Sequence, residues 1–354
     1  MTPVQVESVA NAVLYEGYLL YPYRSSAVKN RQRFNFGIVY PCAHSETSGG
    51  IDPWEMETQC LAVGGPLASL AVKVRFLRLV ERTVGSVSEP LPGLPPGAEP
   101  PYHPSAAIEI DGRTYESWQE ASECDLGLPA ACFAELAAQR IPRQFVLPAT
   151  RSVELLRNSS GLVAGIIVRT QEALDCRIVT SVEEVQDGLY RTCVRISNLT
   201  GMSAAEPPSR DSVLAQSLLS AHTILRVKGG EFISLLDPPP RFAEAANACR
   251  NSGTWPVLAG EAETRDTVLS SPIILYDYPQ IAPESPGDLF DGAEIDEILS
   301  LRILTLTDEE KSAMRRSDER ARRILERTES LPPEHFMKLH GVLRGLDPSG
   351  KEGS

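Results

Sequence analysis

The sequence CRIVTSVEEVQDGLYRTCVRISNLT, at residues 176–200, indicates the fold of this protein more clearly than any other stretch. Two runs rich in β-branched residues flank Asp187-Gly188, a dipeptide that favours the tight turn of a β-hairpin. A second run of the same kind, SVELLRNSSGLVAGIIVRT, turns at Asn158–Gly161, and a third, AIEIDGRTY, turns at Asp111-Gly112. Repeated short strands joined by tight turns predict an antiparallel sandwich or barrel.

The first ninety residues carry further strand patterns. Apolar side chains occupy every second position at 34–40 and again at 72–80. This period of two predicts strands with one buried face. Residues 42–65 lie between them and contain two Gly-Gly pairs and a proline, so we expect this segment to be mostly loop.

Residues 88–104, SEPLPGLPPGAEPPYHP, hold seven prolines. Proline lacks the backbone donor that a sheet ladder or a helix interior requires. The run therefore predicts an extended, solvated loop over the surface. The alternative is a proline motif that a partner protein binds.

Helical patterns appear in the last part of the chain. Ser209 is a plausible cap for a helix over 209–221, and residues 241–251 are expected to be helical. Strands are predicted at 223–227 and 231–236, and SPIILYDY, at 271–278, is a candidate for a buried strand. From Asp291 onward the pattern is helical and, beyond residue 307, unusually rich in charge.

These patterns together predict an α+β protein. Residues 1–205 would form an antiparallel β-sandwich-like body that carries the proline-rich loop. Residues 206–354 would form an α/β region that ends in charged helices.

Composition narrows the classes of function. The chain has 354 residues, a formal net charge of -13 and an isoelectric point near 5.0. An acidic chain of this kind disfavours nucleic acid as a partner, because phosphate binding needs clustered positive charge. Seven cysteines without a CxxC pair, and a first segment without a basic start and apolar core, predict reduced thiols in the cytoplasm. No apolar run approaches the roughly 20 residues of a membrane span.

The sequence contains no catalytic or nucleotide-binding signature, and we expect no cofactor. Cys42, His44 and Cys60 are the candidates for a metal site, since thiolate and imidazole are good zinc or nickel ligands. They fall one ligand short of a structural zinc site. The same Cys42 and His44 could instead act as nucleophile and base in a hydrolytic enzyme.

Ser220-Ala221-His222 is a second candidate for nucleophilic chemistry. Helix positions two apart do not face each other, so the pair is poorly arranged for catalysis. We interpret His222 as a residue near a helix C-terminus, where the helix dipole favours an imidazolium.

Two segments are candidates for protein-binding surfaces. The first, at 11–41, combines aromatic and basic side chains as interface hot spots do, although a core or edge strand would also explain it. Its candidate contacts are Tyr18, Tyr21, Tyr23, Arg24, Arg31 and Arg33. The second is an acidic cluster with Asp277, Asp288 and Asp291, which could dock a basic partner or simply cap helices.

Three stretches carry a resemblance to a known group of proteins: YEGYLLYPYRSSAVKNRQRFNFGIVYP at 15–41, SSPIILYDYPQIAPESPGDLFDGAEIDEILSLRILTLTDEEK at 270–311, and LPPEHFMKLHG at 331–341. The chain resembles uncharacterised proteins encoded in bacterial gene clusters for uptake nickel–iron hydrogenases of the actinobacterial, high-affinity type. The resemblance implies a cytoplasmic, non-catalytic factor in hydrogenase maturation or assembly. Its partner would be a hydrogenase subunit or another maturation protein. The alternatives are the metal-dependent or Cys/His-based hydrolytic enzyme and a scaffold protein of another assembly.

Overall fold

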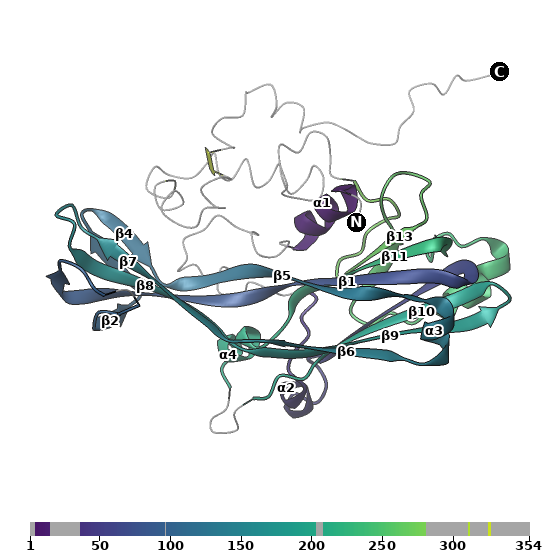
Figure 1. The fold of residues 1–354 in the computed structure, drawn as a ribbon, viewed down its shortest axis with the longest axis horizontal. Coiled ribbons are helices and arrows are strands. Elements are labelled where there is room, and N and C mark those ends of the chain that lie inside the picture. The colour runs from purple at the N-terminus through teal and green to yellow at the C-terminus, as the bar shows by residue number, and fades with distance from the viewer. Residues whose placement is uncertain are drawn as a thin grey trace, which may run out of the picture.

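The computed structural model describes residues 4–14, 36–95, 97–202, 208–280, 311 and 325–326. Within them the protein is an α+β molecule built on one large antiparallel sheet, with short helices packed around it (Figure 1). A separate two-stranded sheet joins β3 (Ala107–Ile110) to β4 (Arg113–Glu116). The antiparallel sandwich-like body predicted from the sequence is confirmed.

One strand runs through the whole sheet. β1 (Glu55–Leu91) has 37 residues and extends from one end of the molecule to the other (Figure 1). Along its length it exchanges one set of neighbours for another. These neighbours are β10 (Leu189–Asn198) and β11 (Leu219–Ile233), then β5 (Trp118–Cys132), and finally β8 (Val163–Gln171) and β2 (Tyr102–Ser105).

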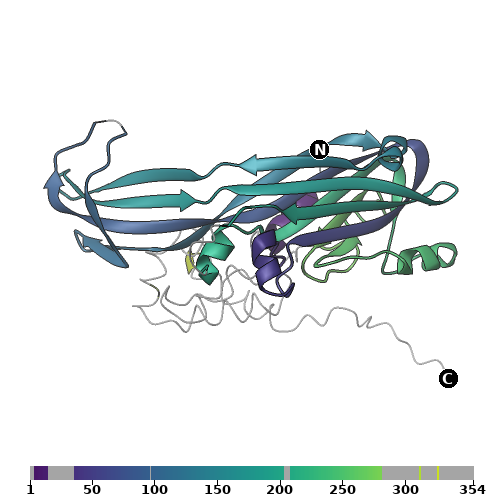
Figure 2. The same ribbon diagram turned by 90° about the horizontal axis from the view of Figure 1, so that it is seen from below.

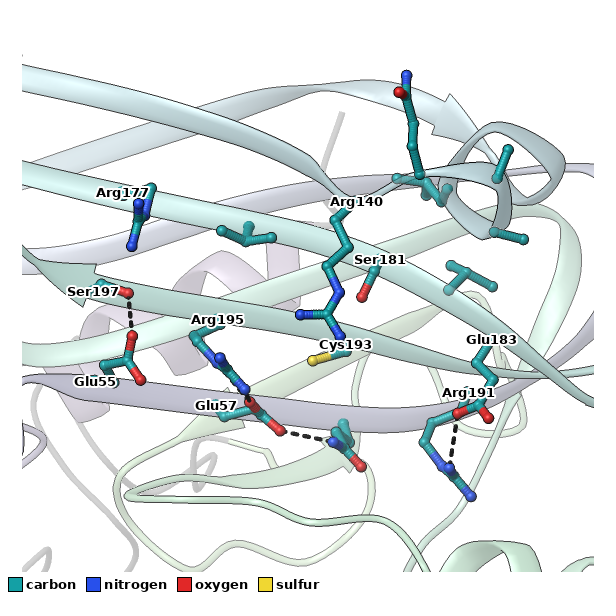
Figure 3. Close-up of a pocket in the computed structure, with 17 residues that line it drawn as sticks. Glu55, Glu57, Arg140, Arg177, Ser181, Glu183, Arg191, Cys193, Arg195 and Ser197 are labelled. Carbon is teal, nitrogen blue, oxygen red and sulfur yellow. Dashed lines mark hydrogen bonds and ion pairs between the residues drawn. The ribbon is translucent and has the colours of Figure 1, made fainter.

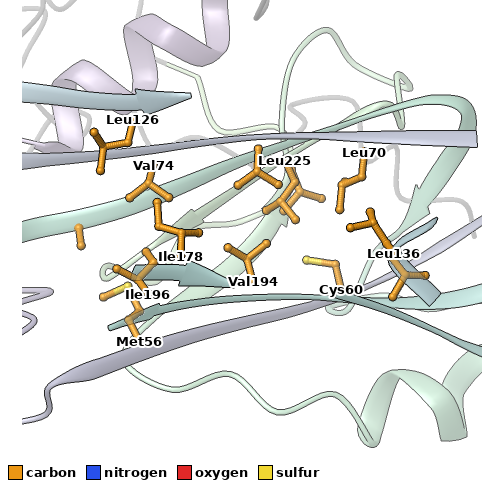
Figure 4. Packing of buried hydrophobic residues seen from close by; sticks show 14 of the residues in the cluster. Met56, Cys60, Leu70, Val74, Leu126, Leu136, Ile178, Val194, Ile196 and Leu225 are labelled. Carbon is orange, nitrogen blue, oxygen red and sulfur yellow. The ribbon is translucent and has the colours of Figure 1, made fainter. Parts of the chain in front are cut away.

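At one end, which we call the body, the sheet folds into two layers. One layer contains β11, β5 and the middle of β1, and the other contains β10, β9 (Leu174–Gln186) and β6 (Ile141–Leu147). Buried side chains from both layers meet between them, as Val74 and Leu225 face Ile178 and Val194 in Figure 4. α3 (Phe133–Ala138) adds Phe133 and Leu136 to this core.

At the other end, which we call the arm, β8, β7 (Thr150–Arg157), β2 and the last third of β1 continue beyond the body. β6 and β7 together pair with β9 and β8, so a single long hairpin links body and arm. Figure 2 shows these strands passing from the arm into the body along the long axis.

Short elements complete the fold. α1 (Val4–Leu14) packs Val6, Val9 and Ala10 against β11 and β13 (Thr267–Ser271). The remaining elements are α2 (Cys42–Thr47), α4 (Arg210–Ala215), a 3-10 turn (Pro240–Phe242), α5 (Ala243–Asn247) and β12 (Trp255–Leu258). Among the described helices, none has the length and apolar character needed to cross a bilayer.

The three predicted hairpins are confirmed, with their turns at the expected residues. Asp111 and Gly112 have φ angles of 50° and 75°, the left-handed backbone that this turn requires. The proline-rich loop is shorter than predicted, since β1 continues to Leu91 and β2 begins at Tyr102. Pro104 lies in β2 opposite Gly85, which the edge position of that strand allows.

Several other predictions were wrong. Val39 forms only an isolated bridge with Leu218, so the described part of 34–40 is not a strand. Residues 42–65 contain α2 and the start of β1, which continues through Gly64-Gly65 as a bulge against β11. The helix predicted at 209–221 ends at Ala215, and β11 replaces the two strands predicted after it.

The segment 271–278 leaves the sheet after Ser271 instead of forming a buried strand. The predicted charged helices after Asp291 lie outside the described residues, apart from residues 311 and 325–326. The boundary predicted after residue 205 separates segments that share one sheet, because β11 pairs with β1.

Candidate functional site

A groove on the outer face of the body is the candidate functional site. It has a volume of about 720 Å³ and lies over β1, β9 and β10, beside the end of α3 (Figure 3). We call it the outer groove. It is lined by Glu55, Glu57, Gln59, Leu136, Ala137, Ala138, Gln139, Arg140, Arg177, Val179, Ser181, Val182, Glu183, Arg191, Cys193, Arg195 and Ser197.

Strand alternation explains why this face is polar. On β9 and β10 the side chains of Ile178, Val194 and Ile196 point into the core, so their sequence neighbours point out into the groove. The register then fixes the rows of the floor. Ser197 lies between Arg177 and Glu55, Arg195 lies between Val179 and Glu57, and Cys193 lies between Ser181 and Gln59.

The carboxylates of the groove are bound within it. Arg195 donates through Nε to Glu57 at 2.8 Å, and Gln59 donates to the other oxygen of Glu57 at 2.7 Å. Ser197 donates to Glu55 at 2.7 Å. At the far end, Arg191 is 3.0 Å from Glu183. These contacts hold the floor in one arrangement and offset its negative charge.

Arg140 and Arg177 differ from the other two arginines of the groove. Within the described residues neither of them has an ion pair or a side-chain hydrogen bond. Figure 3 shows Arg140 reaching over Ser181 and Cys193, while Arg177 lies at the other end of β9 beside Ser197. The groove holds four arginines and three glutamates, so it is a locally positive surface on a chain of net charge -13.

Cys193 is the one thiol that lines the groove, and its environment keeps it protonated. Burial and the neighbouring Glu57 raise its pKa to about 11, although Arg195 and Arg140 act in the opposite direction. A nucleophilic cysteine requires a lowered pKa. Cys193 therefore serves the groove as a neutral, weakly polar side chain.

The candidate metal ligands lie in different surroundings. Cys42 and His44 are on α2, where the Cys42 thiol lies 3.8 Å from Glu46 and His44 Nε2 lies 2.7 Å from Asp52. Cys60 is 1% exposed. Figure 4 shows it among the packed apolar side chains of the body core. The structure does not bring Cys60 to the other two. No group of three or more His, Cys, Asp and Glu in the described residues could hold a metal ion.

The surroundings of Cys42 and His44 also bear on whether the two could act as nucleophile and base of a hydrolytic enzyme. Burial and Glu46 raise the pKa of Cys42 instead of lowering it, and His44 is engaged by Asp52 and not by the thiol. The pair is therefore not arranged as an activated nucleophile and its base.

His222 is a core residue of β11, so the interpretation that placed it at a helix end was wrong. Its side chain is 0% exposed. Nδ1 donates to the Ser220 carbonyl at 2.6 Å, and the Ser271 hydroxyl lies 3.2 Å from Nε2. Burial lowers the pKa of His222 to about 4, so the imidazole is neutral at physiological pH. The Nδ1 hydrogen bond lies within β11, and the contact of Nε2 with Ser271 joins β11 to β13.

The predicted protein-binding residues fall mostly outside the described part of the chain. This holds for Tyr18, Tyr21, Tyr23, Arg24, Arg31, Arg33, Asp288 and Asp291. Asp277 is described and half-buried. Its carboxylate accepts hydrogen bonds from the Leu258 amide at 2.8 Å and the Ser234 hydroxyl at 2.5 Å. Asp277 thus fastens the segment after β13, and a contact with a partner stays a prediction.

Sequence reasoning missed the outer groove entirely. The signal that was present is the spacing of Arg191, Cys193 and Arg195, and of Arg177 and Ser181, at alternate positions of predicted strands. This spacing indicates an exposed face. It does not show that Arg140, from the link between α3 and β6, would lie on that face as well.

Comparison with known proteins yields no family model that matches this chain and no match among the curated proteins.

Proposed function

We propose that this protein is a non-catalytic accessory factor that binds another protein through the outer groove. The observation that carries the proposal is the pair of guanidinium groups, Arg140 and Arg177, that stand in a positive groove without an ion pair in the described structure. Arginine is enriched in the residues that dominate protein–protein binding. It forms bidentate hydrogen bonds with carboxylates, which gives direction as well as attraction.

The rest of the groove suits a binding surface. Its floor is a sheet whose opposite face is the body core, so the side chains stand on a rigid support. Arg195 and Arg191 are already held by Glu57 and Glu183, and a partner would not have to order them. Cys193, with its raised pKa, supports recognition over nucleophilic chemistry at this site.

The proposed partner is a hydrogenase subunit or a maturation protein of an uptake nickel–iron hydrogenase. The resemblance of three stretches of the sequence to proteins of such gene clusters supports this choice, and so does the expected cytoplasmic location. The aromatic and basic segment that follows α1, and the acidic residues Asp288 and Asp291, would add contacts outside the groove.

Affinity purification from cells that make the hydrogenase tests the proposal. The tagged full chain is compared with the double variant Arg140→Glu/Arg177→Glu and with the control Arg143→Glu. Arg143 lies opposite Ile178 on β6 and faces away from the groove, so its reversal changes net charge without changing the site. We expect a hydrogenase subunit or maturation protein to copurify with the wild-type and control chains and to be lost with the double variant. Absence of any such protein above background from all three would refute the proposal.

A further inference from the structure

Arg140 and Arg177, the two arginines of the outer groove without an ion pair in the described structure, lie at a defined spacing. Ile141 pairs with Thr180, which places Arg140 beside Ser181 on β9. Arg177 lies four residues before Ser181 on the same strand. At about 3.3 Å per residue, the two positions are about 13 Å apart along β9.

An apolar side chain stands between them. Val179 points out of β9 into the groove midway between Arg177 and Ser181. An extended peptide has the same rise per residue as β9 and shows one face at every second position. A peptide lying along β9 would therefore present residues i, i+2 and i+4 to Arg177, Val179 and Arg140.

The remaining charges restrict the ligand further. Glu55 and Glu57 occupy the β1 side of the groove, and Glu183 lies at the far end of β9. A continuous polyanion such as a nucleic acid would pass close to these carboxylates, and the net charge of the chain would repel it as well. Two separated negative charges can meet both arginines and avoid the glutamates.

We propose that the outer groove recognises an extended acidic segment of a partner protein, with carboxylates at positions i and i+4 and an apolar residue at i+2. This inference rests on the proposed role of the groove as a protein-binding surface. It adds the chemistry that the partner must show: two Asp or Glu side chains on one face of a strand-like segment, spaced to reach Arg140 and Arg177.

Binding of short labelled peptides to the full chain, followed by fluorescence anisotropy, tests the inference. The probe TETVTET carries the proposed pattern. TQTVTQT removes both charges, TKTVTKT reverses them, and TTTVEET keeps the charge but loses the spacing. We expect TETVTET to bind best. Each of Arg140→Glu and Arg177→Glu should weaken it about tenfold, because repulsion replaces an exposed ion pair. Arg143→Glu should bind it as the wild type does.

Salt and folding provide the remaining controls. Binding of TETVTET should weaken as ionic strength rises, since exposed charges are screened. Thermal unfolding of the groove variants should match that of Arg143→Glu, because Arg140 and Arg177 make no ion pair within the described structure.

Three outcomes would overturn the inference: no binding of TETVTET to the wild type, equal binding of TTTVEET, or tighter binding of an oligothymidylate than of the peptide. If the peptides fail while wild-type but not double-variant protein captures the hydrogenase partner, the proposed function stands and the acidic-segment ligand is wrong. If TETVTET binds as expected but no hydrogenase protein is captured, the ligand stands and the partner is wrong.

Discussion

The body and the arm are built from the same long strand, yet they bury it differently. In the body, β1 lies in a two-layered structure, and Phe76 and Phe232 are 0% exposed in the largest core cluster. In the arm, the described residues form two small clusters of four buried side chains each. We therefore expect the two parts of β1 to differ in stability, because different numbers of buried side chains pack on them. The outer groove lies on the body, and the large core cluster packs against the opposite face of its floor.

The body core should show the largest effect of a single substitution. Phe76→Ala is expected to lower the free energy of unfolding by about 3–5 kcal/mol, because it removes a large side chain between the two layers and leaves a cavity. Urea denaturation measures the change. Leu67→Ala, at a side chain that is 86% exposed in the bulge of β1, is the control and should stay within about 0.5 kcal/mol of the wild type.

Acid should destabilise the body through His222. Its pKa is lowered from 6.5 to about 4 in the folded protein. Well above pH 6.5 the imidazole is neutral in both the folded and the unfolded state and contributes nothing to the pH dependence of stability. Between pH 6.5 and 4 His222 binds a proton in the unfolded chain but stays neutral in the folded one. The free energy of unfolding therefore falls as the pH falls, by about 3 kcal/mol in total.

His222→Asn removes this titration and serves as the comparison. The wild type should lose stability relative to the variant as the pH is lowered from 6.5 to 4, in urea denaturation at several pH values. A difference between the two proteins that does not change with pH would contradict the assignment.

A core substitution in the arm should lower the free energy of unfolding less than one in the body does, and it should leave the body unaffected. Leu156→Ala, in one of the small arm clusters, is expected to cost about 2 kcal/mol, near the lower limit for such changes, because its few neighbours can collapse around the gap. Native-state hydrogen exchange should become faster in β7 and β8 and stay unchanged in β10. Equal acceleration in β10 would mean that arm and body unfold as one unit.

Substitutions that remove an ion pair should change the free energy of unfolding least. Glu120 joins β5 to the arm by contacts with Arg82 at 3.3 Å and Arg169 at 3.0 Å, and its side chain is 22% exposed. Glu120→Gln should cost about 1 kcal/mol by calorimetry. Glu183→Gln, which alters the pair with Arg191, should cost close to nothing because Glu183 is 68% exposed. A larger loss for Glu183 would reverse this ranking of arm and body contacts.

Local sequence signals predicted the hairpins but not the longest strand. Asp111-Gly112, Asn158–Gly161 and Asp187-Gly188 set turns whose registers follow from a few neighbouring residues. Gly64-Gly65 suggested a loop, because glycine weakens a strand by itself. In the folded protein β11 and β10 pair with β1 around this point and carry the strand through the bulge.

The sequence by itself determined the fold class, the hairpin turns and which face of β9 and β10 is polar, because these depend on residues close together in the chain. Only the tertiary structure decided that Arg140 and Arg177 share a groove, that Cys60 is enclosed apart from Cys42 and His44, and that His222 is buried in a strand. The physical reason is distance along the chain: Glu57 and Arg195 meet across 138 residues. Such pairings follow from the packing of the whole sheet and leave no local pattern.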